Sequence, residues 1–267
     1  MTAPRARVPL RHRVEFAGFV LFRGLLRLLP LRASLGLGAA LGWLAGSVLR
    51  VRRTVVDQNL LRAFPRESPA WRSRVAAASY RHLGRESVMT FLLAGASSER
   101  IREMTQVEGL EELEEALARG KGVVMATGHL GNWELGAAAL AARGIGVDAV
   151  VQVQRNRHFD AELRRAREGL GVTVMSKQSA PRGVLSSLRR GRLAALVADQ
   201  NVLRAGVFVE FFGFPAATAK GPAIFALRTG APLWAGAALR VPGRGGRYRV
   251  VMQPVRADLT GLSLIHI

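Results

Sequence analysis

The sequence predicts an α/β fold with a mainly parallel central sheet flanked by helices, preceded by N-terminal membrane-associated helices. From Val107 onward, short apolar runs alternate with helical stretches, which is the pattern of parallel strands joined by helices. Two apolar helical segments bordered by arginines occupy residues 1–50. Between residues 121 and 143, an apolar run, a turn with two glycines and an alanine-rich segment indicate a strand, a turn and a helix.

Composition limits the classes of protein that this chain can represent. With 267 residues, of which 49% are hydrophobic, it can bury a sizeable core. It contains no cysteine, which excludes disulfides, a thiol nucleophile and cysteine-ligated metal sites. The net charge of +20 comes almost entirely from arginine and would attract anionic partners such as phospholipid headgroups, a phosphorylated glycolipid or an acidic carrier protein. Aromatic residues are only 6% of the chain and offer little surface for base stacking, so we expect no nucleic-acid partner.

Residues 1–50 are predicted to form membrane-anchoring or interfacial helices. Residues 14–29 are apolar except for Glu15, Arg23 and Arg27, and the two arginines lie four residues apart on one helical face. Residues 33–49 carry no charge, and a membrane-spanning helix needs about 17–25 residues. A span, a re-entrant hairpin and a buried soluble helix all remain open, and the flanking arginines favour attachment to a membrane.

Residues 51–105 form a predicted helical segment that packs on the α/β domain. An amphipathic helix is expected over 53–64, and Ser68 is a suitable N-cap for a longer helix that continues toward Leu93. His82 lies in this longer helix, and its helical setting favours a packing or surface role.

Residues 106–261 are predicted to form the α/β domain. The expected strands are 122–127, 147–153, 171–175, 193–198 and 232–239, and the expected helices are 109–119, 132–143, 158–169, 180–190 and 217–229. The ligands of such sheets bind at the carboxyl ends of the strands, so the residues after each strand are the first candidates for chemistry.

The turn after the strand at 122–127 carries His129, and Glu134 follows in the first turn of a helix that Asn132 would cap. A carboxylate in a first helical turn is stabilised by the helix dipole, and it could accept the imidazole N–H and leave the other ring nitrogen as a base. This pair could deprotonate a hydroxyl without a covalent enzyme intermediate. The plainer alternative is a turn histidine beside a glutamate that only favours the helix terminus.

Further candidate residues follow along the chain. Arg164 and Arg167 end a predicted helix, where cations also simply favour the helix dipole. Asp199 arrives at the carboxyl end of an apolar strand, where it could contact a ligand or cap a turn. An aromatic cluster over 206–215 precedes Thr218; such a cluster is usually core, and if exposed it would suit acyl chains or a membrane surface.

The string His-Leu-Gly-Asn-Trp-Glu at 129–134 resembles the catalytic block of the late acyltransferases of lipid A biosynthesis, within the lysophospholipid acyltransferase superfamily. The later blocks also occur in the order found in that family. The matching positions are Arg167 before a glycine, Asp199 at a strand end, Phe211-Phe212-Gly213 with Thr218 downstream, and the early Asn59…Phe64-Pro65 block. The Gln-Asn that follows Asp199 departs from the family pattern.

The resemblance implies a membrane-associated O-acyltransferase that moves a fatty acyl chain from an acyl carrier protein thioester to a hydroxyl of a lipid A precursor. It implies His129 as general base, Glu134 as its partner, and Arg167, Asp199, Asn132, Arg164 and Thr218 as substrate-binding or supporting residues, with no metal and no cofactor. The implied location is the bacterial inner membrane, with the catalytic domain facing the cytoplasm. The implied partners are the carrier protein, a phosphorylated glycolipid acceptor and the membrane surface.

Two alternatives remain open. The same chemistry could serve a lysophospholipid or a phosphatidylinositol mannoside. In a different class, the chain could be a noncatalytic basic protein that binds membrane surfaces by charge, which would leave the turn at His129 unexplained.

The last residues, 262–267, differ from the alanine- and arginine-rich chain before them. They match a translation of a library-preparation adapter, so we expect a non-native tail and a natural sequence that continues differently after about Gly261.

Overall fold

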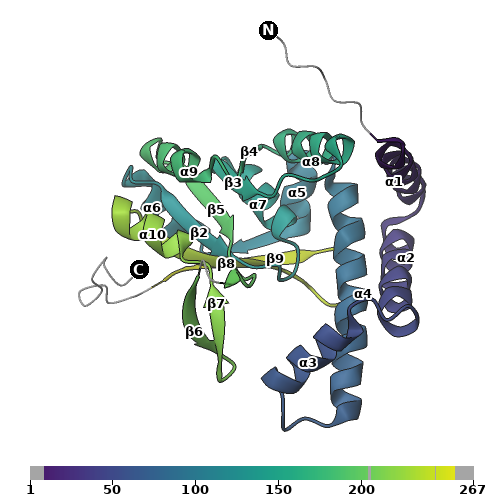
Figure 1. Cartoon of the computed structure of the whole chain (residues 1–267). Coiled ribbons are helices and arrows are strands. Elements are labelled where there is room, and N and C mark those ends of the chain that lie inside the picture. The colour runs from purple at the N-terminus through teal and green to yellow at the C-terminus, as the bar shows by residue number, and fades with distance from the viewer. Residues whose placement is uncertain (1–8, 204–205, 244, 256–267) are drawn as a thin grey trace.

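The computed structural model describes residues 9–203, 206–243 and 245–255 (Figure 1). Its centre is one sheet of seven strands: β1 (Thr105–Glu108), β2 (Val123–Thr127), β3 (Val147–Val151), β4 (Val172–Ser176), β5 (Leu193–Val197), β8 (Leu233–Arg240) and β9 (Tyr248–Pro254). The strand order is β1-β9-β8-β2-β5-β3-β4. All neighbouring pairs are parallel except β8 with β9, so the prediction of a mainly parallel sheet is confirmed.

Helices cover both faces of this sheet, and the alternation of side chains along the strands decides which face each residue joins. On β2, Val123 and Met125 pack with α7 (Trp133–Ala141) in the larger core cluster. Val124, between them, packs in a second cluster with residues of α9 (Ala180–Arg189) and α10 (Gly221–Thr229). A strand buried on both faces must be apolar throughout, which is why β2 reads as a continuous hydrophobic run.

The predicted helices of the α/β domain correspond to α6 (Leu110–Ala118), α7, α8 (Arg157–Gly169), α9 and α10. A further short helix, α5 (Ser98–Met104), precedes β1 and was not predicted. A separate hairpin of β6 (Val207–Phe211) and β7 (Phe214–Thr218) extends away from the sheet, as Figure 1 shows. The expected helix over 217–229 is therefore corrected at its start, because residues 217 and 218 pair in β7.

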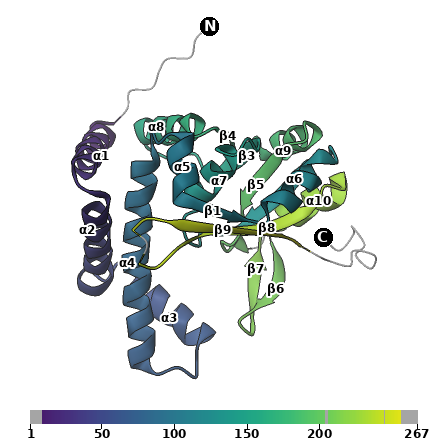
Figure 2. The same cartoon turned by 180° about the vertical axis from the view of Figure 1, so that it is seen from behind.

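The N-terminal part is a set of helices along one end of the domain, seen from behind in Figure 2. They are α1 (Leu10–Leu28), α2 (Leu31–Trp43) with the π-helical turn η1 (Leu44–Val48), α3 (Arg53–Ala63) and α4 (Pro69–Leu93). Ser68 caps α4 as expected, its side chain accepting a hydrogen bond from the Trp71 amide at 3.1 Å. Side chains of α4 and α5, among them Met89 and Ile101, enter the larger core cluster.

The second apolar segment packs lengthwise against α4. The stretch Leu31–Val48 is long and apolar enough to cross a membrane, and 33% of it is buried within the structure. Its other side exposes large apolar side chains, including Leu41, Trp43 and Leu44. The segment is thus a helix with one face on the protein and one apolar face outward.

Glycines permit the close approach of α2 and α4. A Cβ added to Gly84 would lie 2.0 Å from the carbonyl oxygen of Gly38, and one added to Gly42 would lie 2.1 Å from that of Tyr80. We therefore expect Gly84→Ala to separate the two helices and to lower the free energy of unfolding by about 1–3 kcal/mol.

The matched control for this prediction is Gly36→Ala on α2, where an added Cβ meets nothing within 4 Å. It should be neutral or stabilising by up to about 1 kcal/mol, because alanine favours a helix. Denaturant unfolding of the detergent-solubilised variants measures both. Equal stability of the two variants would show that the tight crossing does not contribute.

The tail predicted at 262–267 lies outside the described residues, and so does the sequence around Gly261.

Candidate active site

His129 lies two residues after β2, in the turn that leads to α7. Gly131 has a φ of +66°, and a Cβ there would lie 1.9 Å from the carbonyl oxygen of Ala238. Only glycine allows this turn to lie directly against β8. Asn132 then donates its backbone N–H to the same oxygen at 2.8 Å, and its side chain caps α7 by accepting the Leu135 amide at 2.9 Å. The turn that holds His129 is therefore fixed on both sides.

Asp199 is the carboxylate that holds the imidazole. Its Oδ1 lies 2.8 Å from Nδ1 of His129, and its Oδ2 accepts the backbone N–H of His129 at 2.7 Å. Gly128 makes this approach possible, since a Cβ there would lie 3.0 Å from the Asp199 carboxylate. With Nδ1 bonded to a carboxylate, Nε2 is the nitrogen available as a base.

The expected hydrogen bond from His129 to Glu134 is therefore corrected. Glu134 instead forms a bidentate ion pair with Arg167, at 2.9 Å from Nε and 2.5 Å from Nη2. The reason is geometric: the cap at Asn132 starts α7 at once, and the first helical turn directs Glu134 toward the last turn of α8. The ring of Trp133 contacts His129 edge-on, with centroids 4.6 Å apart.

The Glu134–Arg167 pair is largely buried, with side-chain exposures of 16% and 19%. Burial alone lowers the pKa of Arg167, but the hydrogen bonds and charge of Glu134, with Asp160 adding to them, outweigh burial and leave the pKa above its ordinary value. Arg167 therefore stays charged, and its charge is partly neutralised by Glu134. A buried arginine held in this way is a poor free ligand for a phosphate.

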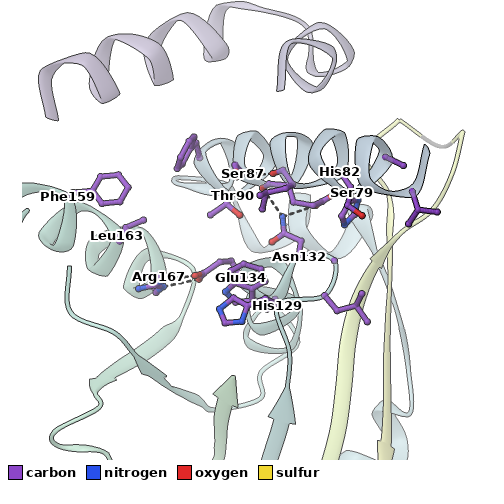
Figure 3. A pocket seen from close by; sticks show the side chains of 18 residues that line it. Ser79, His82, Ser87, Thr90, His129, Asn132, Glu134, Phe159, Leu163 and Arg167 are labelled. Carbon is purple, nitrogen blue, oxygen red and sulfur yellow. Dashed lines mark hydrogen bonds and ion pairs between the residues drawn. The ribbon is translucent and has the colours of Figure 1, made fainter. Parts of the chain in front are cut away.

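His129, Glu134 and Arg167 line a cavity of about 710 Å³ between α4, α8 and the turn at His129 (Figure 3). Its walls are mostly apolar, and polar atoms come from a few side chains on α4 and on the turn. The side chains labelled in Figure 3 are Ser79, His82, Ser87, Thr90, His129, Asn132, Glu134, Phe159, Leu163 and Arg167. A mostly apolar cavity with a few polar groups at one side is typical of a site for a small molecule or lipid.

A second cavity, of about 1020 Å³, lies on the side of Asp199. The hairpin β6–β7 forms much of its wall, with exposed Phe208, Phe211 and Phe214. Thr218 also lines this cavity, and its hydroxyl donates to the carbonyl oxygen of Ala216 at 3.2 Å. The aromatic cluster of the sequence is thus exposed beside the site rather than part of the core.

Two other predicted site residues, Asn132 and Arg164, have the following positions. Asn132 is 1% exposed, and its side chain stabilises the turn by capping α7. Arg164 lies away from Glu134 on the same helix as Arg167, 3.8 Å from Glu168 and 3.5 Å from the carbonyl oxygen of Val174. The structure thus separates Arg164 from the group of His129, Asp199, Glu134 and Arg167.

A buried polar network behind the turn was not predicted. Glu86 of α4, only 4% exposed, accepts hydrogen bonds from Asn132 Nδ2 at 3.1 Å, from the Tyr248 hydroxyl at 2.7 Å and from Arg240 Nε at 2.7 Å. Burial, and then the charge of Glu86, raise the pKa of Tyr248, so its hydroxyl remains a donor. In the sequence, Glu86 stands as a single acidic residue within α4, and the sequence pattern does not distinguish a buried glutamate from an exposed one.

Among the described residues, no group of three or more His, Cys, Asp or Glu side chains could hold a metal ion.

Comparison with known proteins supports the resemblance. Residues 3–261 match the family model of bacterial lipid A biosynthesis acyltransferases. A phosphatidylinositol mannoside acyltransferase of Mycobacterium tuberculosis is 36% identical over 131 residues, which are 48% of this chain and 42% of that protein. Its namesake in Mycolicibacterium smegmatis is 29% identical over 238 residues, 85% of this chain and 76% of that protein. A lipid A biosynthesis palmitoleoyltransferase of Escherichia coli is 26% identical over 220 residues, 82% of this chain and 71% of that protein. The match thus spans less than half the length of the first of these relatives.

Proposed function

Because the chain belongs to the bacterial lipid A biosynthesis acyltransferase family, we propose that it transfers a fatty acyl chain from a thioester to a hydroxyl of a phosphorylated glycolipid. The observation that carries this proposal is the His129–Asp199 pair beside a mostly apolar cavity. A fixed imidazole at the edge of an apolar site suits a reaction in which a lipid hydroxyl must lose a proton. A noncatalytic membrane binder would need neither the pair nor the cavity.

The proposed reaction needs no covalent enzyme intermediate. Nε2 of His129 takes the proton of the acceptor hydroxyl as its oxygen attacks the thioester carbonyl carbon, and Asp199 stabilises the imidazolium that forms. The tetrahedral intermediate then breaks its C–S bond, and the leaving thiolate takes the proton from the imidazolium. Glu134 and Arg167 form the cavity wall, and Nη1 of Arg167, which the ion pair does not use, is left for the developing oxyanion.

The two cavities suggest a division between the substrates. The aromatic cavity at β6–β7 suits the acyl chain of the donor, and the cavity between α4 and α8 suits the acceptor, so that their reacting groups meet at His129. An acyl carrier protein is the proposed donor. It is acidic, and the net charge of +20 on this chain would attract it.

We propose that the protein works at the cytoplasmic face of the bacterial inner membrane. The outward face of α2 exposes Leu41, Trp43 and Leu44, and α1 adds exposed Leu21 and Leu25. Apolar helix faces bordered by arginine are typical of segments that lie in a membrane interface. Detergent, rather than high salt, should therefore be needed to extract the protein from membranes.

Two acceptors are candidates. A lipid A precursor follows from the family model, whereas a phosphatidylinositol mannoside is favoured by the higher identities, 36% and 29% against 26%, with relatives of that name. Both are glycolipids with a phosphate group near the sugar hydroxyls, so the same cavity could serve either.

The decisive experiment offers the detergent-solubilised chain an acyl carrier protein that bears a labelled acyl chain, with each acceptor in turn and with a lysophospholipid as competitor. We expect transfer to one of the two glycolipids. Transfer to the lysophospholipid alone would keep the chemistry and replace the acceptor, while no transfer to any acceptor would contradict the proposal.

A further inference from the structure

A third cavity, of about 660 Å³, adjoins the acceptor cavity on the far side of the turn at His129. It is lined by α2, α4, the turn, and the end of β8 with the segment that follows. The two cavities share His82, Leu130 and Gly131 in their walls. We call it the basic cavity, because its charged lining residues are Arg32, Arg85 and Arg240, with His82 beside them.

The lining of the basic cavity contains no aspartate or glutamate. Arg240 is engaged by Glu86 and Tyr248 behind the wall, so its charge is partly balanced. In the described part of the chain, Arg32 and Arg85 form no ion pair with a carboxylate, and Arg85 is half-buried. Arg32 also lies in the first turn of α2, where the helix dipole disfavours a cation, so helix stability does not account for it.

The acceptor of the proposed reaction is a phosphorylated lipid, and its phosphate needs a cationic partner. The resemblance implied Arg167 as a substrate-binding or supporting residue, but Glu134 holds Arg167 with both of its carboxylate oxygens. Arg32 and Arg85 of the basic cavity are not held in this way, and this cavity meets the acceptor cavity at Leu130, next to the general base.

We propose that the basic cavity is a subsite for the phosphate group of the acceptor lipid, with Arg32 and Arg85 as its ligands. This inference rests on the proposed function. Charge-assisted hydrogen bonds from two arginines to a phosphate would orient the glycolipid, so that its sugar hydroxyl reaches His129 while its acyl chains lie in the acceptor cavity. The subsite would act on acceptor binding and leave the chemical step unchanged.

The first test measures equilibrium binding without a donor. The full chain in nonionic detergent is titrated with a lipid A precursor, and with the same lipid after enzymatic removal of its phosphate monoester. We expect the phosphorylated lipid to bind more tightly to the wild type, and we expect Arg32→Gln with Arg85→Gln to weaken its binding by about 10-fold or more and to remove the difference. The control is Arg81→Gln, an exposed arginine of α4 outside the cavity. An unchanged preference for the phosphorylated lipid in the double variant would overturn the proposal.

The second test uses steady-state kinetics and distinguishes the acceptor lipid from the donor carrier protein as the ligand of Arg32 and Arg85. We expect the double variant to raise KM for the phosphorylated acceptor, with kcat and the KM of the donor within about twofold of the wild type. Arg85→Lys should restore part of the affinity because it keeps the charge. A rise in the KM of the donor alone would assign the arginines to the carrier protein and overturn the proposal. If the wild type binds the lipid through phosphate but transfers nothing, the subsite stands and the proposed reaction fails.

Discussion

Asp199→Asn should lower kcat for acyl transfer by about 10²- to 10⁴-fold, approaching the loss expected for His129→Ala. Asparagine fits the same space, but it removes the charge that stabilises the imidazolium and the acceptor that keeps the proton on Nδ1. The measurement is single-turnover transfer of a labelled acyl chain at saturating acceptor, which isolates the chemical step.

Two controls identify which carboxylate serves the histidine. Glu210→Gln removes an exposed acid of β6 and should leave kcat unchanged. Glu134→Gln, assayed well below its unfolding temperature, should lower kcat less than Asp199→Asn does. The reverse order of these two losses would show that Glu134 orients the imidazole during catalysis and would reinstate the pairing expected from the sequence.

Loss of either partner of the Glu134–Arg167 pair should be the most destabilising single change in the site. The pair is bidentate and largely buried, and removing one partner of a buried pair leaves an uncompensated charge at a cost of about 3–5 kcal/mol. We expect Arg167→Met to lower the free energy of unfolding by about 3 kcal/mol. Denaturant unfolding in detergent measures the change.

A double-mutant cycle tests whether the two charges are coupled. Glu134→Gln combined with Arg167→Met should be more stable than the sum of the single changes predicts, because no unpaired charge remains. Arg164→Gln is the matched control on α8: Arg164 is 41% exposed and 3.8 Å from Glu168, so its loss should cost less than about 1 kcal/mol. Additive single effects would mean that the ion pair contributes little to stability.

The strand, turn and helix around His129 were predicted well, because the apolar run, the turn glycines and the N-cap each act over only a few residues. Asn132 caps the helix that it was expected to cap, and the strand before it ends at Thr127 as the apolar run indicates. The hairpin β6–β7 was missed, because a cluster of aromatic residues is usually core and composition alone does not show that it forms an exposed hairpin.

The sequence by itself determined the α/β class and the strand, turn and helix that carry His129, because hydrophobic periodicity, caps and turns are local properties. Only the tertiary structure decided which side chains meet. β2 and β5 are separated in sequence but are parallel neighbours with Thr127 opposite Val197, so the second residue past each strand, His129 and Asp199, arrives at the same edge of the sheet. Glu134 is five residues from His129, yet the helix that begins at Trp133 directs its side chain to Arg167. Strand order and helix direction are global properties of packing, and spacing along the chain does not contain them.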